Sequence, residues 1–296
     1  MLLMSLPKLK PSLYTSCMHG LDDLGWTHGF SFTSYGVRVG VRSDEEEILN
    51  SLMLRIPYRS ELSSMHLVDR MFSVVPIRKP NSTSVLYNLY CDHELYGKQL
   101  EFSQLLDRFD SFSTLTVAEL SDNYLFMHAG VVEWRGRGIL LPGKSFAGKS
   151  TLVMEFLKHG AKYYSDEFAV IDAEGFVLPY RKPISLRISD NSTQSTTISP
   201  DANSQAHQKK LSVELIAFCQ YGVDSVWQPK CLSQGLGMIS LLQYTHSAQR
   251  APERALTMLN RVVENVTIIE SERGEATIVA PLLLGYAGKE KYNEVN

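Results

Sequence analysis

The sequence predicts an α/β protein in two parts, a smaller α+β N-terminal domain over residues 1–122 and a core of strands and helices over residues 123–296. Three observations predict this class. Short apolar segments with strand-like alternation recur along the chain, segments of helical periodicity separate several of them, and a glycine-rich loop links a buried strand to a helix in the second part. A length of 296 residues permits one large domain or two ordinary ones.

The elements of the first part follow from periodicity and from end signals. Val37, Val39 and Val41 alternate with polar residues, which predicts a half-exposed strand. The segment 43–46 (S-D-E-E) matches a capping box, so we expect a helix that ends before Pro57. The other elements expected here are strands at 72–77, 84–91 and 94–96 and a helix over 100–120.

The second part alternates strands and helices more tightly. The helix expected over 150–159 ends at Gly160, a common C-terminal residue. The stretch 189–210 is rich in Ser, Thr, Asn and Gln and has too few apolar residues to order itself, so we predict a mobile loop there. The other elements expected are strands at 124–134, 138–141, 163–172, 176–178, 184–188, 215–221 and 267–269, and helices at 236–246 and 253–263.

Composition excludes some classes of protein. Hydrophobic residues make up 44% of the chain, enough for a sizeable core, and a net charge of −3 argues against a general nucleic-acid-binding role. We expect no membrane segment, because the apolar run Val279 to Leu284 has six residues and contains Pro281. The four cysteines form no C-x-x-C pair and the N-terminus lacks signal-peptide features, so we expect reduced thiols in the cytoplasm.

The segment 143–150 (G-K-S-F-A-G-K-S) fits the phosphate-binding pattern G-x-x-x-x-G-K-[ST]. Its glycines let successive N–H groups point at phosphate oxygens, Lys149 reaches the terminal phosphates, and the Ser150 hydroxyl ligates Mg²⁺. The following helix adds its dipole. We predict a nucleoside triphosphate site; the alternative is a Gly/Ser-rich turn without a ligand. The predicted nucleotide-binding residues are Gly143, Lys144, Ser145, Phe146, Ala147, Gly148, Lys149, Ser150 and Thr151.

Two adjacent acids, Asp166 and Glu167, lie inside the strand expected after this helix. Neighbouring strand residues point to opposite faces, so at least one of the two needs a charged partner. Mg²⁺ beside a triphosphate suits one carboxylate, and the other is suited to accept a proton from an incoming hydroxyl. Asp172 is a rival metal ligand, although the following Ala-Glu-Gly favours a turn residue.

Two basic side chains are further candidates. His128 lies on the strand expected before the loop strand, so its imidazole comes near the γ-phosphate if the two strands are neighbours. The alternative is a core or turn histidine bonded to backbone. Arg187 is a candidate contact for a phosphate or an acidic substrate, and an exposed strand arginine is an equal alternative.

Together these residues resemble the HPr kinase/phosphorylase family, and more closely its HPr-kinase-like relatives. The likeness rests on M-H-A-G-V-V-E-W-R-G-R-G-I-L-L-P-G-K-S-F-A-G-K-S-T-L and H-G-A-K-Y-Y-S-D-E-F-A-V-I-D. In that family a histidine stands fifteen residues before the first loop glycine, as His128 stands before Gly143. Its acid pair follows the loop serine by sixteen and seventeen residues, as Asp166 and Glu167 follow Ser150. The likeness is good over 125–187 and loose from there to the C-terminus.

The resemblance implies a mixed-sheet P-loop kinase core with a fold related to phosphoenolpyruvate carboxykinase. It implies ATP-dependent phosphorylation, with Mg²⁺, of a serine-type hydroxyl on a protein, peptide or small molecule. The catalytic residues implied are His128, Lys149, Asp166 and Glu167, with Glu167 as proton acceptor and with Ser150 and Asp166 as metal contacts. Proteins of this family tend to form oligomers, so a homo-oligomer is a further expectation.

Two features of the family are missing. The E-I-R-G-L-G-like signature that supplies a glutamate metal ligand reads P-I-S-L-R-I-S here, and the second signature with its catalytic arginine is not found. These departures argue against HPr itself as substrate and against the phosphorylase half-reaction. Two alternatives stay open: an ATP-binding regulatory module without transfer activity, and an ordinary P-loop ATPase that uses Asp172 for Mg²⁺.

Overall fold

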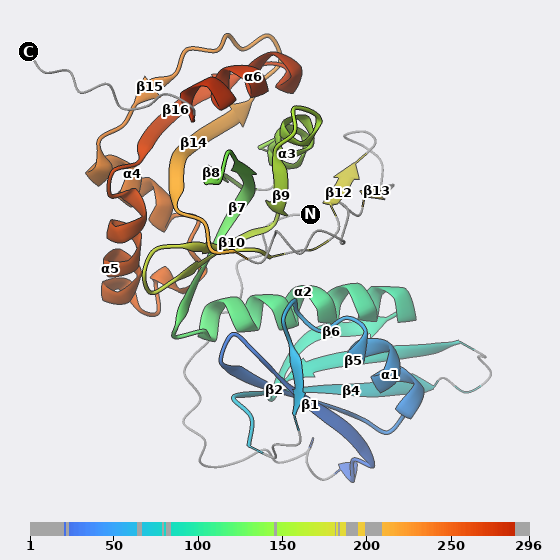
Figure 1. Cartoon of the computed structure of the whole chain (residues 1–296). Coiled ribbons are helices and arrows are strands. Elements are labelled where there is room, and N and C mark those ends of the chain that lie inside the picture. Colours follow the sequence, from blue (N-terminus) through green and yellow to red (C-terminus); the bar gives the residue numbers. More distant parts are fainter. Residues whose placement is uncertain are drawn as a thin grey trace, which may run out of the picture.

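The computed structural model describes residues 21, 24–63, 67–78, 80, 84–144, 147–180, 182, 184–187, 195–198 and 209–287, with the backbone alone at 184–187 and 195–198. They form a mixed α/β fold with two large mixed sheets and a two-stranded one (Figure 1). Within these residues, no helix combines the length and the apolar character needed to cross a bilayer.

The first sheet has six strands and two helices. Its elements are β1 (His28–Ser34), β2 (Val37–Ser43), α1 (Glu46–Met53), β3 (Glu61–Ser63), β4 (Arg70–Arg78), β5 (Val85–Cys91), β6 (Glu94–Leu100) and α2 (Phe102–Leu120). The strand order is β3-β1-β2-β4-β5-β6, with β2 and β4 parallel. Helix α1 packs on β1 and β2, and α2 packs on β5 and β6 and lies between the two large sheets (Figure 1).

The second sheet carries the 143–150 loop. Its elements, with the two-stranded sheet, are β7 (Tyr124–Trp134), β8 (Arg137–Pro142), α3 (Lys149–Lys158), β9 (Lys162–Ser165), β10 (Phe168–Asp172), β11 (Val177–Leu178), β12 (Ile184–Arg187), β13 (Ser195–Ile198), β14 (Val213–Tyr221), β15 (Lys230–Cys231), α4 (Gln234–Leu242), the 3₁₀ helix η3 (His246–Ala248), α5 (Pro252–Val263), β16 (Thr267–Arg273) and α6 (Ala276–Tyr286). The order is β11-β10-β7-β8-β14-β16-β15, with β9 also on β7.

Two helical layers cover this second sheet. Helices α3 and α6 pack on one face, and α4 and α5 on the other. Strands β8, β14 and β16 are parallel to one another, and β7 is antiparallel to β8. The carboxyl ends of the three parallel strands therefore meet at one edge, where ligands bind in open sheets of this kind.

An aromatic cluster joins the two large sheets in one core. Tyr35 from the first part packs edge-on against Phe126, with ring centroids 5.0 Å apart, and Phe168 packs against Tyr180 at 5.6 Å. All four side chains are buried. Since this core crosses the junction of the two parts, the predicted boundary at residue 122 stays a prediction, although it falls between α2 and β7.

The structure corrects several sequence-based expectations. The capping box is not formed: Glu45 is the N-cap residue of α1, and the Ser43 hydroxyl donates to the Val74 carbonyl because Ser43 belongs to β2. Strands β1, β3 and β15 and helix α6 were not expected, whereas β11 is the strand expected at 176–178. Helix α6 was missed because it contains Pro281, which removes a backbone donor.

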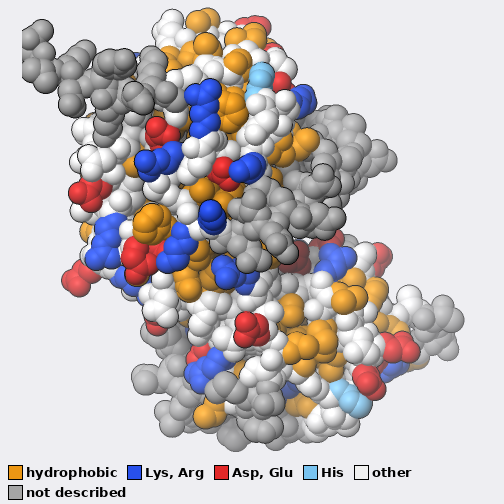
Figure 2. Space-filling model, viewed as in Figure 1, with side chains coloured by type: hydrophobic (Ala, Val, Ile, Leu, Met, Phe, Trp, Pro, Cys, Tyr) orange, Lys and Arg blue, Asp and Glu red, His pale blue; other side chains and the backbone are white. Residues whose placement is uncertain are grey.

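Two further corrections concern the region of the site. The strand expected over 163–172 is two strands, β9 and β10, which separate at the acid pair. The loop expected over 189–210 contains β13, which pairs with β12, while 188–194 and 199–208 lie outside the described residues. On the face shown in Figure 2, basic and acidic side chains are intermingled.

A candidate phosphate-binding and catalytic site

The 143–150 loop lies at the shared edge of the parallel strands, between the end of β8 and the start of α3. The Gly143 N–H donates to the His128 carbonyl (3.3 Å), and the Ala147 carbonyl accepts from the Tyr221 N–H at the end of β14 (3.3 Å). Ser145 and Phe146 lie outside the described residues. The loop is therefore anchored on both sides, to β7 and to β14.

Gly148 is the N-cap residue of α3 and has a φ of 80°, a conformation that L side chains rarely adopt. A Cβ at this position would also clash with the Arg273 guanidinium. We expect Gly148→Ala to lower the free energy of unfolding by about 1–3 kcal/mol more than Gly136→Ala does. Gly136 is a matched control because its φ is 83° but no atom lies within 4 Å of the point that a Cβ would occupy there. Equal losses in urea unfolding would contradict the predicted contact.

Lys149 is buried and folds back over the loop. Its Nζ donates to the carbonyl oxygens of Gly143 and Lys144, each at 2.8 Å. Burial lowers the pKa of Lys149 to about 8, and the carboxylate of Asp166 partly opposes this change. A largely desolvated ammonium group thus lies within the loop, where it strongly favours an anionic ligand.

The loop and the acid pair meet at Ser150. The Ser150 hydroxyl donates to Oδ2 of Asp166 at 3.1 Å, and the Tyr163 hydroxyl lies 3.1 Å from Oδ1. Burial raises the pKa of Asp166, while the hydrogen bonds from Tyr163 and Ser150 and the charge of Lys149 lower it. A hydroxyl and a carboxylate side by side are suitable ligands for Mg²⁺, which keeps several waters and takes further oxygens from substrate phosphates.

No group of three or more acidic, His or Cys side chains that could hold a metal by itself is found among the described residues. This finding is compatible with Mg²⁺, because a site completed by phosphate and water oxygens requires only one or two protein ligands. Ser150 and Asp166 fit that chemistry.

The acid pair occupies a turn between β9 and β10. The Ser165 hydroxyl accepts the N–H groups of Glu167 (3.2 Å) and Phe168 (3.0 Å), which turns the chain and ends β9. The Ala129 N–H donates to the Glu167 carbonyl (3.3 Å), so the turn remains attached to β7. Because the two acids lie in a turn, the strand alternation expected for them does not apply.

Glu167 belongs to a charge network that reaches the first part of the chain. Lys182 Nζ lies 3.4 Å from Glu167 Oε2 and 2.9 Å from Oδ1 of Asp110 on α2. Burial raises the pKa of Glu167; Lys182 lowers it, and Asp110 and Asp166 raise it. Neither Lys182 nor Asp110 was predicted from the sequence, because they are 72 residues apart and show no shared motif.

His128 lies on β7 opposite Phe168 of β10, and its ring centroid is 6.3 Å from that of Phe168. Burial, followed by the charge of Lys149 and an interaction with His246, lowers the pKa of His128 to about 3. The imidazole is therefore neutral at pH 7. A second partly buried histidine, His246, packs its ring edge-on against Phe168 at 5.2 Å and was not predicted from the sequence.

Arg273 at the end of β16 was also missed. Its side chain is almost fully buried, and Nη2 donates to the Gly148 carbonyl at 2.8 Å. The guanidinium lies 5.4 Å from the ring centroid of Tyr221. In the sequence, a single arginine at the end of a strand is typical of an exposed residue. Only the tertiary contacts of Arg273 reveal that it lies against the loop.

Of the remaining candidates, Lys144 and Thr151 belong to the predicted nucleotide-binding segment, whereas Arg187 and Asp172 lie on other strands. Thr151 and Lys144 are exposed. Arg187 lies on β12, which packs near α3, and the side chain of Arg187 is outside the described residues. Asp172 pairs in register with Tyr124, four residues along β7 from His128 and so about 13 Å away. Asp172 forms a turn with Glu174 and Phe176 and an ion pair with Lys210, so it is not placed to hold a metal at the loop.

The fold and the site define a mixed α/β protein in which a candidate phosphate-binding loop meets two carboxylates. No protein-family model matches the chain, and no curated protein matches it.

Proposed function

We propose that this chain is an ATP-dependent phosphotransferase that transfers the γ-phosphoryl group to a serine-type hydroxyl of a protein, peptide or small molecule, with a P-loop kinase core related to that of the HPr-kinase-like proteins. One observation supports the proposal: the hydrogen bond from Ser150 to Asp166 joins the loop to the acid pair, so a carboxylate lies beside the position that a terminal phosphate held in the loop would occupy.

Each residue has a role in this reaction. The loop N–H groups and Lys149 hold the phosphates, and Ser150 and Asp166 would hold Mg²⁺, which supplies neutralisation of phosphate charge. The acceptor oxygen forms a bond to the γ-phosphorus as the bond to the ADP oxygen breaks, and Glu167 accepts the hydroxyl proton. The neutral His128 orients the acid pair or the phosphate. Positioning and charge neutralisation provide most of the catalysis in such reactions.

The test is transfer of the γ-phosphoryl group. The purified chain with Mg²⁺ and γ-labelled ATP is expected to label an acceptor in fractionated cell extract, and Lys149→Met is expected to abolish labelling. Micromolar ATP binding without labelling of any fraction would favour the regulatory module instead. ATP hydrolysis that Asp172→Asn abolishes and Glu167→Gln does not would favour the ordinary ATPase.

The pH dependence of transfer tests Glu167 as the base. The base must be ionised, so activity is lost as the pH falls through the raised pKa of Glu167. Asp110→Asn removes a negative neighbour and is expected to shift this acid limb to lower pH, whereas Lys182→Met removes a positive one and shifts it to higher pH.

Asp107→Asn on the same helix is the control for these variants, because Asp107 is exposed and pairs only with Arg55 among the contacts described for it. Its pH profile is expected to match the wild type. Shifts of Asp110→Asn and Lys182→Met in the same direction would contradict the role of Glu167.

A further inference from the structure

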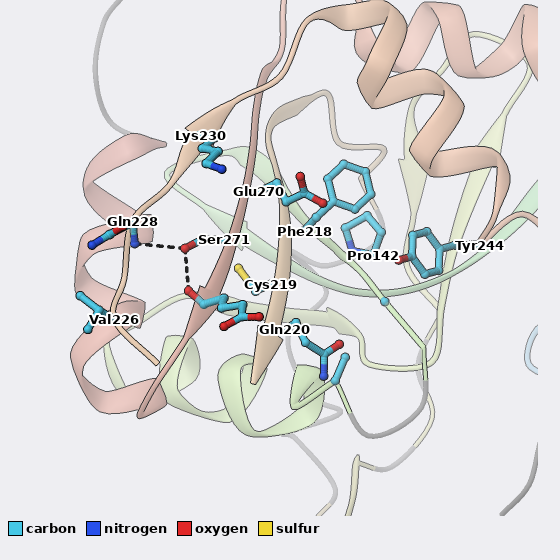
Figure 3. Close-up of a pocket in the computed structure, with 13 residues that line it drawn as sticks. Pro142, Phe218, Cys219, Gln220, Val226, Gln228, Lys230, Tyr244, Glu270 and Ser271 are labelled. Atoms are coloured by element: carbon cyan, nitrogen blue, oxygen red, sulfur yellow. Dashed lines mark hydrogen bonds between the residues drawn. The ribbon is translucent and has the colours of Figure 1, made fainter. Parts of the chain in front are cut away.

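A pocket of about 550 Å³ lies beside the 143–150 loop, within the range of about 300–1,000 Å³ typical of small-molecule sites (Figure 3). Gly143 and Ala147 form one wall. The last residues of β14 and β16, the segment leading into β15, and Tyr244 form the others. The pocket therefore lies at the carboxyl edge of the parallel strands, directly against the loop.

Most of the pocket lies on the opposite side of the loop strand from the acid pair; the exception is Tyr244, whose carbonyl accepts the N–H of His128 on β7 (2.8 Å). In the sheet order, β14 and β16 follow β8 on one side, while β7, β9 and β10 lie on the other. Among the described residues that line the pocket, none is His128, Asp166 or Glu167. A triphosphate bound in the loop with its γ-phosphate near Asp166 therefore has its other end on the side of the pocket.

The pocket combines aromatic and acidic side chains. The rings of Phe218 and Tyr244 lie close together, with centroids 6.1 Å apart, and Glu270 lies beside Phe218 (Figure 3). Glu272 also lines the pocket and accepts a hydrogen bond from Ser225 (3.1 Å). Two carboxylates disfavour phosphate here, whereas carboxylates commonly accept hydrogen bonds from ribose hydroxyls, and aromatic rings pack well on a flat base.

We propose that this pocket binds the nucleoside part of the nucleotide, a purine ribonucleoside whose ribose hydroxyls donate to Glu270 or Glu272 and whose base packs near Phe218 and Tyr244. The inference rests on the proposed function, since it requires the loop to hold the phosphates. We assign the pocket to the nucleoside rather than to the acceptor, because most of its lining comes from β14 and β16, whereas an acceptor hydroxyl must come within hydrogen-bond reach of Glu167.

Calorimetric titration with three probes, ATP, 2′-deoxy-ATP and inorganic tripolyphosphate, each with Mg²⁺, tests the proposal. The wild type is expected to bind ATP more tightly than the other two. In the double variant Glu270→Gln/Glu272→Gln, the affinity for ATP is expected to fall about ten-fold or more. Tripolyphosphate affinity is expected to stay the same or to rise, since two negative charges are removed. Retained tripolyphosphate binding also shows that the variant is folded.

Glu264→Gln is the matched control, because Glu264 is exposed and precedes β16 at the opposite edge of the sheet. It is expected to bind all three probes as the wild type does. Unchanged ATP affinity in the double variant, an equal fall for ATP and tripolyphosphate, or unchanged discrimination between ATP and 2′-deoxy-ATP would overturn the nucleoside site while leaving the proposed function in place. If the wild type binds neither ATP nor tripolyphosphate, the proposed function fails as well.

Discussion

Replacing Glu167 by glutamine is expected to reduce phosphoryl transfer by about 10²–10⁴-fold, the usual contribution of a general base, while Mg²⁺-ATP affinity stays close to that of the wild type. Glutamine keeps the size of the side chain but cannot accept the proton of the acceptor hydroxyl at neutral pH. Because Asp166 rather than Glu167 bonds to Ser150, the loop is left intact. Single-turnover transfer and calorimetric titration with ATP measure the two quantities separately.

Asp172→Asn is the control for this variant. This variant also removes one negative charge, but Asp172 lies at the end of β10 that is away from His128. Asparagine retains the oxygen that accepts the N–H groups of Glu174 and Phe176, so the turn is kept. Transfer by Asp172→Asn is expected to be near the wild-type rate. A rate for Glu167→Gln within a few-fold of the wild type would exclude Glu167 as the base.

Lys149→Met is expected to lower ATP affinity by about 100-fold, since charge-assisted hydrogen bonds to the phosphates contribute about 1.5–3 kcal/mol each. The same variant is expected to be more stable than the wild type by about 1–2 kcal/mol. Burial lowers the pKa of Lys149 from 10.5 to about 8, so the charged form disfavours the folded state at pH 7. The hydrogen bonds to Gly143 and Lys144 that are lost offset part of the gain.

The stability difference between Lys149→Met and the wild type has a defined pH dependence. Above pH 8 the folded wild type begins to lose the Lys149 proton, while the unfolded chain keeps it up to about pH 10.5. The free energy of unfolding of the wild type therefore rises between pH 8 and about pH 10.5, whereas that of the variant has no such contribution. The extra stability of Lys149→Met over the wild type becomes smaller as the pH rises. Urea unfolding at pH 7 and at pH 9.5 measures it. A variant that is less stable than the wild type at pH 7 would contradict the predicted cost of the buried ammonium group.

Most of the local structure could be predicted from the sequence. The alternation of Val37, Val39 and Val41 predicts a strand that is present as β2, and the G-x-x-x-x-G-K-S pattern predicts the strand, loop and helix that are present as β8, the 143–150 loop and α3. The element over 163–172 was only partly right. Its apolar residues are strand residues, but the Ser165 hydroxyl captures two N–H groups and breaks the strand at the acids.

The sequence predicted the positions of the site residues within the G-x-x-x-x-G-K-S motif, but not the residues from other parts of the chain that contact the site. The spacing of Gly143 to Ser150 places Lys149 and Ser150 at the start of a helix whatever the rest of the chain does, because the loop conformation depends on adjacent residues. The neighbours of the acids were not predictable. Lys182 and Asp110 lie 72 residues apart, and Arg273 and Gly148 lie 125 residues apart, so neither pair produces a sequence pattern.

Local sequence therefore specifies the periodic strands and helices and the strand–loop–helix arrangement around residues 143–150, since backbone preferences and side-chain period act over a few residues. Long-range packing is what brings Asp110 on α2 to the network of Glu167, sets Arg273 of β16 against Gly148, and gathers Phe218, Tyr244 and Glu270 around one pocket. These contacts depend on how the helices and the two large sheets pack, and packing is set by the shapes of buried side chains far apart in the chain.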